Sequence, residues 1–290
     1  MISREALEKR IKSRKLKNRI FHTLFFLSAF FGIAVLFVLL YDVVQMSLGW
    51  LNWNFISTFD SRKYEEAGMI AGIVGSLYLI GIAAPLSFIL GVATAIYLEE
   101  YAKPSRFNWI IQTNISNLAG IPSIVYGLLG LAIFVRYLGF DRSVLSGALT
   151  LTLLILPVII VASQEAIKAV PNSLRNASFA LGAGKWTTIF RIVIPSSLPG
   201  MLTGSILGVS RALGETAPII IIGAVAYTAK LPSSIFDSFT AMPIQIYGWT
   251  GLPKEEFRHV ASAGIVVLMF ILLSINALAI ILRNKYAKKI

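Results

Sequence analysis

The chain has 290 residues, and its composition excludes most classes of soluble protein. It is 56% hydrophobic and 14% charged, whereas a soluble domain carries about 25% charged residues. The lack of cysteine excludes disulfides, thiolate metal sites and cysteine nucleophiles. The net charge of +12 would favour nucleic-acid binding in a soluble protein, but the composition is typical of a membrane protein.

Long apolar runs predict six membrane-spanning helices. A helix needs about 20 mostly apolar residues to cross the hydrocarbon core of a bilayer. The first run is too long for a signal peptide and lacks a cleavage site, so we expect an uncleaved anchor. We therefore expect an all-α polytopic membrane protein. The runs lie at residues 21–46, 69–98, 109–135, 143–163, 196–228 and 260–282.

The distribution of lysine and arginine predicts the orientation. Eighteen of the 26 lie on one side of the predicted spans, seven lie on the other, and Arg211 lies inside a span. Since cytoplasmic loops carry the excess, we expect both termini in the cytoplasm and the basic surface near anionic lipid rather than nucleic acid. The expected parts are a basic cytoplasmic tail 1–20, a first span and outer loop 21–68, a membrane core 69–283 and a cytoplasmic tail 284–290.

Two long outer connections, at 47–68 and 229–259, mix aromatic with polar residues. An aromatic belt at the membrane interface explains those beside the spans. Docking of an outer partner protein explains the middle of the second connection equally well. The aromatic residues are Trp50, Trp53, Phe55, Tyr64, Phe236, Phe239, Tyr247 and Trp249.

The connection at 170–199 predicts a short cytoplasmic helix. Pro171 and Asn172 are typical of a helix start, and Gly182 is typical of a stop. A helix of two turns is unstable alone, so we expect it to lie in a groove of a partner; packing on its own spans is the alternative. One face carries Leu174, Ala177, Ser178 and Leu181.

This segment resembles the cytoplasmic loop of ABC importer permeases, E-A-A-x3-G-x9-I-x-L-P. At the matching positions the chain has Asn176-Ala177-Ser178, then Gly182, Ile192, Ile194 and Pro195. It differs from the motif at three of them, where Asn176 replaces Glu, Ser178 replaces Ala and Ile194 replaces Leu. The resemblance implies a coupling helix at about 172–182 that sits in a cleft of an ATPase subunit. The residues that it assigns to coupling are Asn176, Ala177, Ser178, Phe179, Leu181 and Gly182.

No motif for chemistry on this chain is apparent. The string Gly182-Ala183-Gly184-Lys185 resembles a phosphate-binding loop, but Phe179 and Trp186 occupy positions that require Gly and Ser or Thr. We expect no enzyme activity and no cofactor in this subunit, with ATP and Mg bound by a separate ATPase. His22 and His259 are expected near opposite membrane faces, so no metal site is predicted.

The fifth predicted span contains an ion pair. Arg211 and Glu215 lie on either side of its centre, roughly 6 Å apart along the axis. Because a charge costs at least about 2.5–3.5 kcal/mol at the bilayer centre, they must face protein or a water-filled path. A guanidinium suits an oxyanion, with Glu215 holding it; a salt bridge that fixes helix register is the alternative. A small-residue stripe for close packing is formed by Gly200, Gly204, Gly208 and Ala212.

Pro122 interrupts the third predicted span, with Ser116, Asn117 and Ser123 nearby. A broken membrane helix exposes backbone groups that can line a path. A tolerated proline kink explains the same pattern.

The strings G-I-P-S-I-V-Y-G-L and S-R-A-L-G-E-T-A-P resemble the phosphate-specific ABC importer permeases, the PstA and PstC pair, and the overall plan resembles PstA. The resemblance covers nearly the whole chain beyond residue 65. It implies a type I importer permease (MetI-like) architecture and a phosphate pathway lined by Arg211, Glu215, Thr216 and Ser123.

The same resemblance implies several partners in the cell membrane. They are a PstC-like permease, a PstB-like ATPase dimer and an outer phosphate-binding protein. An importer for another oxyanion, such as molybdate or sulfate, is the alternative, and a secondary transporter or channel is a third interpretation.

Overall fold

The computed structural model describes residues 4–225 and 227–287, which form helices and loops without a strand. A 3-10 turn, η1 (Tyr64–Glu66), and three π-helical segments, η2 (Tyr97–Tyr101), η3 (Leu131–Tyr137) and η4 (Ile189–Val193), join or extend the α-helices. The α-helices are α1 (Arg4–Ser47), α2 (Trp53–Ser57), α3 (Ile70–Ile96), α4 (Arg106–Leu118), α5 (Ser123–Gly130), α6 (Val144–Lys168), α7 (Asn172–Ala180), α8 (Lys185–Thr188), α9 (Ile194–Gly214), α10 (Ala217–Ile222), α11 (Met242–Thr250) and α12 (Glu256–Ala287).

Within the described residues, five helical stretches are long and apolar enough to cross a membrane, and a sixth span results if a bent pair counts as one. The bent pair is α4 with α5 and η3, at an angle of 108°. The predicted all-α plan is confirmed, but the fifth span is not the predicted 196–228: it runs over Lys185–Gly214. The other spans are Arg14–Ser47, Ile70–Tyr101, Val144–Lys168 and Glu256–Lys285.

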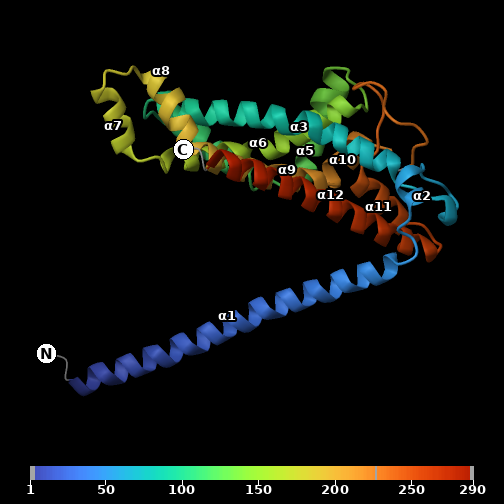
Figure 1. The fold of residues 1–290 in the computed structure, drawn as a ribbon, viewed down its shortest axis with the longest axis horizontal. Helices are drawn as coiled ribbons and strands as arrows, with labels where there is room; N and C mark the ends of the chain where they lie inside the picture. Colours follow the sequence, from blue (N-terminus) through green and yellow to red (C-terminus); the bar gives the residue numbers. More distant parts are fainter. Residues whose placement is uncertain (1–3, 226, 288–290) are drawn as a thin grey trace.

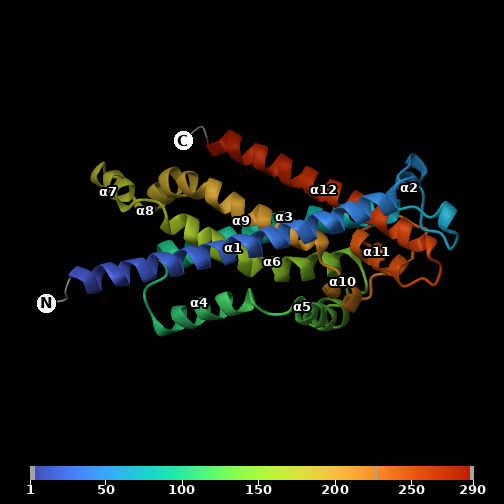
Figure 2. The same ribbon diagram turned by 90° about the horizontal axis from the view of Figure 1, so that it is seen from below.

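The central helices α3, α6 and α9 pack along one another and form a bundle with two different ends (Figure 1). The end that carries α7 and α8 is called the α7 end, and the end that carries α2 and α11 is called the α11 end. Figure 2 shows that the described chain begins and finishes toward the α7 end.

The predicted stripe of small residues on α9 is confirmed as a packing surface. A methyl group added at Gly204 would lie 2.1 Å from the Cβ of Ala162 on α6. One added at Gly200 would lie 2.7 Å from the Cβ of Ala166. The two helices therefore touch through their backbones, which is possible only with small side chains.

α1 leaves the bundle at the α11 end and diverges from it along its length (Figure 1). It packs on α12 there, where His259 Nδ1 donates a hydrogen bond to the carbonyl oxygen of Met46 over 2.9 Å. Its most apolar stretch is unburied. From Arg4 onward the predicted basic tail 1–20 is helical and continues without a break into the first span. α12 likewise extends to Ala287, into the predicted tail 284–290.

The α11 end is a compact cap. The Phe55 and Trp249 rings are 5.8 Å apart, and both residues are buried together with Phe239. The backbone N–H of Met242 donates to the buried Ser76 hydroxyl on α3 over 2.9 Å. These three aromatic residues therefore belong to the protein core rather than to an interfacial belt or a docking surface, which corrects the sequence prediction for them.

Candidate functional site

The break after α9 places an arginine and a glutamate side by side. Glu215 adopts an extended conformation, and Arg211 Nε donates a hydrogen bond to its Oε1 over 3.1 Å. The Arg211 side chain is 45% exposed and that of Glu215 is 16% exposed. Within the described chain only Nε of this guanidinium is hydrogen-bonded. Its two terminal amino groups can therefore bind an anion.

The ion pair lies between the middle of the bundle and the α11 end. Arg211 is in the last turn of α9, and Glu215 follows that helix. Gly208 lies against Ile159, close to the middle of α6, and Arg211 comes almost one turn further toward the α11 end. The sequence prediction placed the pair at the centre of a single span at 196–228, whereas the structure divides this apolar run among α9, the break and α10.

The two short helices that follow breaks, α5 and α10, pack against each other. A methyl group added at Gly127 would lie 2.7 Å from the Cα of Pro218. The Tyr126 hydroxyl donates across the α4–α5 break to the carbonyl oxygen of Leu118 over 2.8 Å. The break is thus a sharp bend of 108° that tertiary contacts hold in place. It is a larger interruption of the helix than a tolerated proline kink.

These helices bring the predicted pathway residues into one region. Ser123 is the first residue of α5, and Thr216 directly precedes α10. Among the described residues neither hydroxyl is hydrogen-bonded to the Arg211–Glu215 pair. Ser123 and Thr216 therefore lie on elements next to the ion pair without a direct hydrogen bond to it.

The predicted short helix at 172–182 is present as α7. It is capped at Leu181, and Gly182 has a φ of +80°, which suits glycine at a helix end. Leu181 is 89% exposed and Phe179 is 47% exposed. Asn176 and Ala177 are exposed as well. Leu181 and Phe179 make this surface largely apolar, and the described part of the chain does not cover it.

Ser178 differs from the other residues predicted to couple. Its side chain turns inward, and its hydroxyl lies 2.8 Å from that of Thr188 on α8. Both residues are buried. Ser178 therefore fixes the angle between α7 and α8 rather than forming part of the exposed face, which corrects its predicted place.

Sequence reasoning missed a polar cluster at the α7 end. Arg175 of α7 is paired with Glu100 of η2 over 3.0 Å. Glu99 accepts a hydrogen bond from Gln164 Nε2 over 2.8 Å and lies 3.6 Å from Lys168 Nζ. The signal that could have found this cluster is two adjacent glutamates directly after an apolar run.

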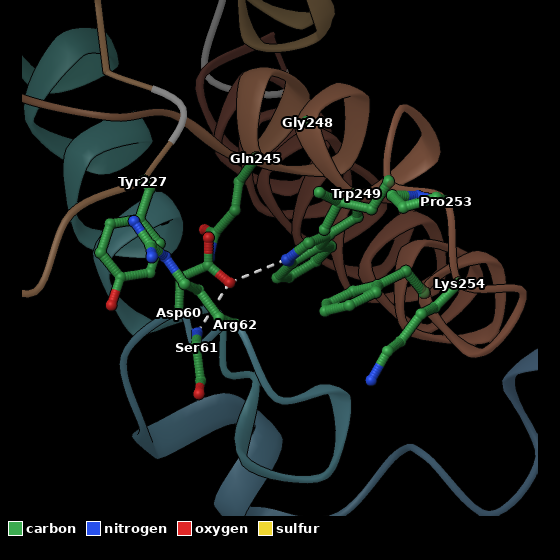
Figure 3. Close-up of a pocket in the computed structure, with 11 residues that line it drawn as sticks. Asp60, Ser61, Arg62, Tyr227, Gln245, Gly248, Trp249, Pro253 and Lys254 are labelled. Atoms are coloured by element: carbon green, nitrogen blue, oxygen red, sulfur yellow. Dashed lines mark hydrogen bonds between the residues drawn. The ribbon is translucent and has the colours of Figure 1, made fainter.

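A second missed feature is a pocket of about 430 Å³ at the α11 end. Asp60 Oδ1 accepts hydrogen bonds from Trp249 Nε1 over 2.8 Å and from the Ser61 backbone N–H over 2.9 Å (Figure 3). Burial raises the pKa of the Asp60 carboxyl from 3.8 to about 6, although these hydrogen bonds oppose the rise. Arg62 and Lys254 also line the pocket.

Spanning helices, two packed helix breaks and an exposed short helix between spans define a polytopic membrane permease. The chain belongs to the binding-protein-dependent transport system inner membrane component family, whose model matches residues 87–290.

Curated relatives cover nearly the whole chain. It is 34% identical over 278 residues to the phosphate transport system permease protein PstA 1 of Mycobacterium tuberculosis (strain CDC 1551 / Oshkosh), covering 93% of this chain and 90% of that protein. It is 31% identical to the phosphate transport system permease protein PstA of Pasteurella multocida, covering 92% and 94%. The probable ABC transporter permease protein YqgI of Bacillus subtilis is 29% identical, covering 96% and 99%.

Solved structures share the fold at low sequence identity. A bacterial alginate ABC transporter, in complex with a periplasmic protein bound to an alginate pentasaccharide, aligns with a TM-score of 0.68 at 15% identity, covering 96% of this chain and 99% of that one. An inward-facing MetNI methionine ABC transporter aligns with a TM-score of 0.64 at 15% identity, covering 75% and 95%. The predicted architecture of an ABC importer permease is confirmed.

Proposed function

We propose that this chain is a transmembrane subunit of an ATP-driven importer, and that with a second, PstC-like permease it forms the pathway for inorganic phosphate. The observation that carries the proposal is Arg211, a half-exposed guanidinium at a helix break with only its Nε engaged. A planar fork with two available amino groups suits the oxygens of phosphate. The PstA relatives support phosphate over other oxyanions.

Glu215 gives the proposed pathway a way to release its substrate. A bound anion would compete with this carboxylate, which already holds Arg211 over 3.1 Å. Competition weakens binding and prevents a deep trap, as conduction requires. Ser123 and Thr216, at the starts of α5 and α10, are proposed to provide hydroxyl groups to the same anion.

The α7 end is proposed to lie in the cytoplasm together with both termini. The side of the spans that includes α7 and the termini carries most of the lysines and arginines, and cytoplasmic segments carry this excess. The exposed apolar surface of α7 is proposed to occupy a cleft of a PstB-like ATPase dimer, which binds ATP and Mg. A phosphate-binding protein is proposed to dock at the α11 end, on the outer face.

Reconstitution tests the proposal. The chain is co-expressed with a PstC-like permease and a PstB-like ATPase, and the complex is placed in proteoliposomes with a phosphate-binding protein. We expect uptake of labelled phosphate that requires ATP and exceeds the uptake of molybdate or sulfate. A preference for either of those oxyanions would overturn the phosphate assignment. Uptake without ATP, driven by an ion gradient, would instead indicate a secondary transporter.

Substitution of Arg211 tests the site itself. Charged hydrogen bonds contribute about 1.5–3 kcal/mol each, so we expect Arg211→Ala to reduce phosphate uptake by about tenfold or more, while the ATPase subunits still co-purify. Arg211→Lys should retain part of the activity because it keeps the charge but not the fork. The matched control is Arg136→Ala, which removes an exposed arginine from η3. Normal uptake by Arg211→Ala would contradict the pathway role.

A further inference from the structure

α7 is connected to the bundle by few contacts. Among the helices it packs mainly on α8 and η4. Its large apolar residues Leu174 and Phe179 are exposed, as is Leu181 at its C-cap. A helix of nine residues held in this way needs a further connection if its movement is to reach the spans.

Arg175 provides that connection to α6. Its side chain is 16% exposed. Nη1 donates a hydrogen bond to the carbonyl oxygen of Val170 over 2.6 Å, and Nη2 donates to that of Ile167 over 2.9 Å. The Ile167 carbonyl is in the last turn of α6, where the helix dipole favours a cation, and Val170 follows directly after the C-cap of that helix. The guanidinium therefore fastens α7 to the end of a central span.

Glu100 extends the connection to a second span. It lies in η2, which continues α3, and its side chain is 13% exposed. Its Oε1 accepts hydrogen bonds from Arg175 Nη2 over 3.0 Å and from Arg175 Nε over 3.3 Å. One guanidinium thus joins α7, the end of α6 and the end of α3. A lysine could not replace these contacts, because it lacks the planar arrangement of donors.

The helices that Arg175 joins lead to the proposed pathway. α3 and α6 pack along each other, and α6 packs on α9 through the close contact of Gly204 with Ala162. α9 carries Arg211 near its end. Interdigitated helices move as packed bodies rather than bending continuously. A displacement of α7 can therefore reach the break between α9 and α10.

We propose that the Arg175–Glu100 pair is the positioning contact that makes α7 move together with α3 and α6, and so couples ATP hydrolysis to opening of the pathway. The proposal rests on the proposed function, since it deepens the role given there to α7. Arg175 does not touch substrate or ATP. It acts through the helices that it joins.

A double-mutant cycle in the reconstituted complex tests this role, with the number of phosphates transported per ATP hydrolysed as the readout. We expect Arg175→Met to lower this ratio at least tenfold, and Glu100→Gln to lower it by a smaller factor. The double variant should be no worse than Arg175→Met alone, because the two residues serve one contact. Arg175→Lys should fall between Arg175→Met and the wild type.

Lys168→Met is the matched control. Lys168 lines the same polar hollow as Arg175 and is paired with Glu165 and Glu99, but it does not reach α7. We expect its transport ratio to stay within twofold of the wild type. Equal loss in Lys168→Met and Arg175→Met would overturn the proposal, because any damage to the cluster would then uncouple. A wild-type ratio in an assembled Arg175→Met complex would overturn it as well.

A distance measurement gives an answer even if Arg175→Met prevents transport or assembly with the ATPase. The chain has no cysteine, so spin labels can be placed at Ala177→Cys on α7 and Lys103→Cys after η2. We expect one narrow distance distribution in the full chain, and a clearly broader one with Arg175→Met or Arg175→Lys but not with Lys168→Met. An equally narrow distribution in both Arg175 variants would contradict the proposal. Failure of phosphate transport by the wild-type complex would instead contradict the proposed function alone.

Discussion

The two ends of the bundle differ in whether their apolar side chains are buried or exposed. At the α11 end, a connection of about 40 residues folds back onto α3 and buries Phe239 and Trp249 completely. At the α7 end, a helix of nine residues leaves Leu181 and Phe179 exposed and makes its few fixed contacts through polar groups. The α11 end completes its own core, whereas the α7 end leaves an apolar surface uncovered.

Because of this difference, we expect residues at the α11 end to determine the stability of the chain and residues at the α7 end to determine its activity. A side chain buried at the α11 end contributes to the free energy of unfolding of this chain by itself. An exposed apolar side chain on α7 contributes little to folding, because it stays in water when the chain folds alone. Substitutions at the two ends should therefore affect different measurements.

The largest expected effect is a loss of stability at the α11 end. Trp249→Ala removes a fully buried ring that packs on Phe55 and leaves Asp60 without its indole partner. We expect the variant to lose about 3–5 kcal/mol of stability. Thermal unfolding of the purified protein, followed by circular dichroism, measures the loss. A melting temperature equal to that of the wild type would show that this cap does not contribute to the stability of the fold.

The next effect is a loss of partner binding at the α7 end. Leu181→Glu places a charge on the exposed apolar surface, and we expect the ATPase subunit to bind roughly tenfold more weakly or worse, as for a central interface residue. The melting temperature of the chain alone should not change. Leu48→Glu, at an exposed leucine beyond α1, is the control. Full retention of the ATPase by Leu181→Glu would mean that the docking surface lies elsewhere.

A smaller effect is the pH dependence of the α11 end. The pKa of Asp60 is about 6 in the folded chain, above its ordinary value of 3.8, so the fold favours the protonated carboxyl. The free energy of unfolding should therefore fall as the pH rises from about 4 through 6. Above that range, the whole contribution of the protonated Asp60 carboxyl should be lost. Asp60→Asn keeps an oxygen for both hydrogen bonds, which end on the same Oδ1.

We accordingly expect the wild type to melt at a higher temperature at pH 5 than at pH 7.5, and Asp60→Asn to show less of this change. Asp237→Asn is the control, because hydrogen bonds from Ser233 and Ser234 lower the pKa of that carboxyl. The prediction would be contradicted if the wild type melted at a higher temperature at pH 7.5 than at pH 5 and Asp60→Asn did not. Asp60 would then stabilise the fold in its ionised form.

The smallest expected effect concerns the joint between α7 and α8. Ser178→Ala removes the buried hydrogen bond to Thr188, which we expect to cost about 1 kcal/mol. Coupling of ATP hydrolysis to transport should fall only slightly, since Arg175 still holds α7. Thr188→Val should give the same change in stability, and the double variant should add little. Strongly additive losses would show that the two hydroxyls act separately.

Local signals in the sequence were sufficient for several elements. Pro171 and Gly182 bound α7 correctly because start and stop residues act within one turn. The stripe that includes Gly204 indicated a helix contact because small residues allow close approach. The end of α9 was missed, although Gly214 and Pro218 together are typical of a break. Hydropathy stays high across that break, so an apolar run alone could not reveal it.

The contacts that define the site were not accessible in the same way. Arg175 and Glu100 are 75 positions apart in the sequence, and Asp60 and Trp249 are 189 positions apart. No periodicity or motif links such pairs, because each residue is placed by the packing of different helices. The inward turn of Ser178 likewise depends on α8, a neighbour that the helical pattern of α7 does not contain.

The sequence by itself determined that this protein is a helical membrane permease with an exposed helix between two spans. Apolar length, charge asymmetry and helix stop residues are local properties, and the bilayer permits few other structures for them. Only the tertiary structure decided where the chain bends within the membrane, which aromatic residues form the core, and which arginine holds α7. Those features depend on the close packing of residues far apart in the chain, where steric fit and burial select one arrangement among the many that the same local pattern allows.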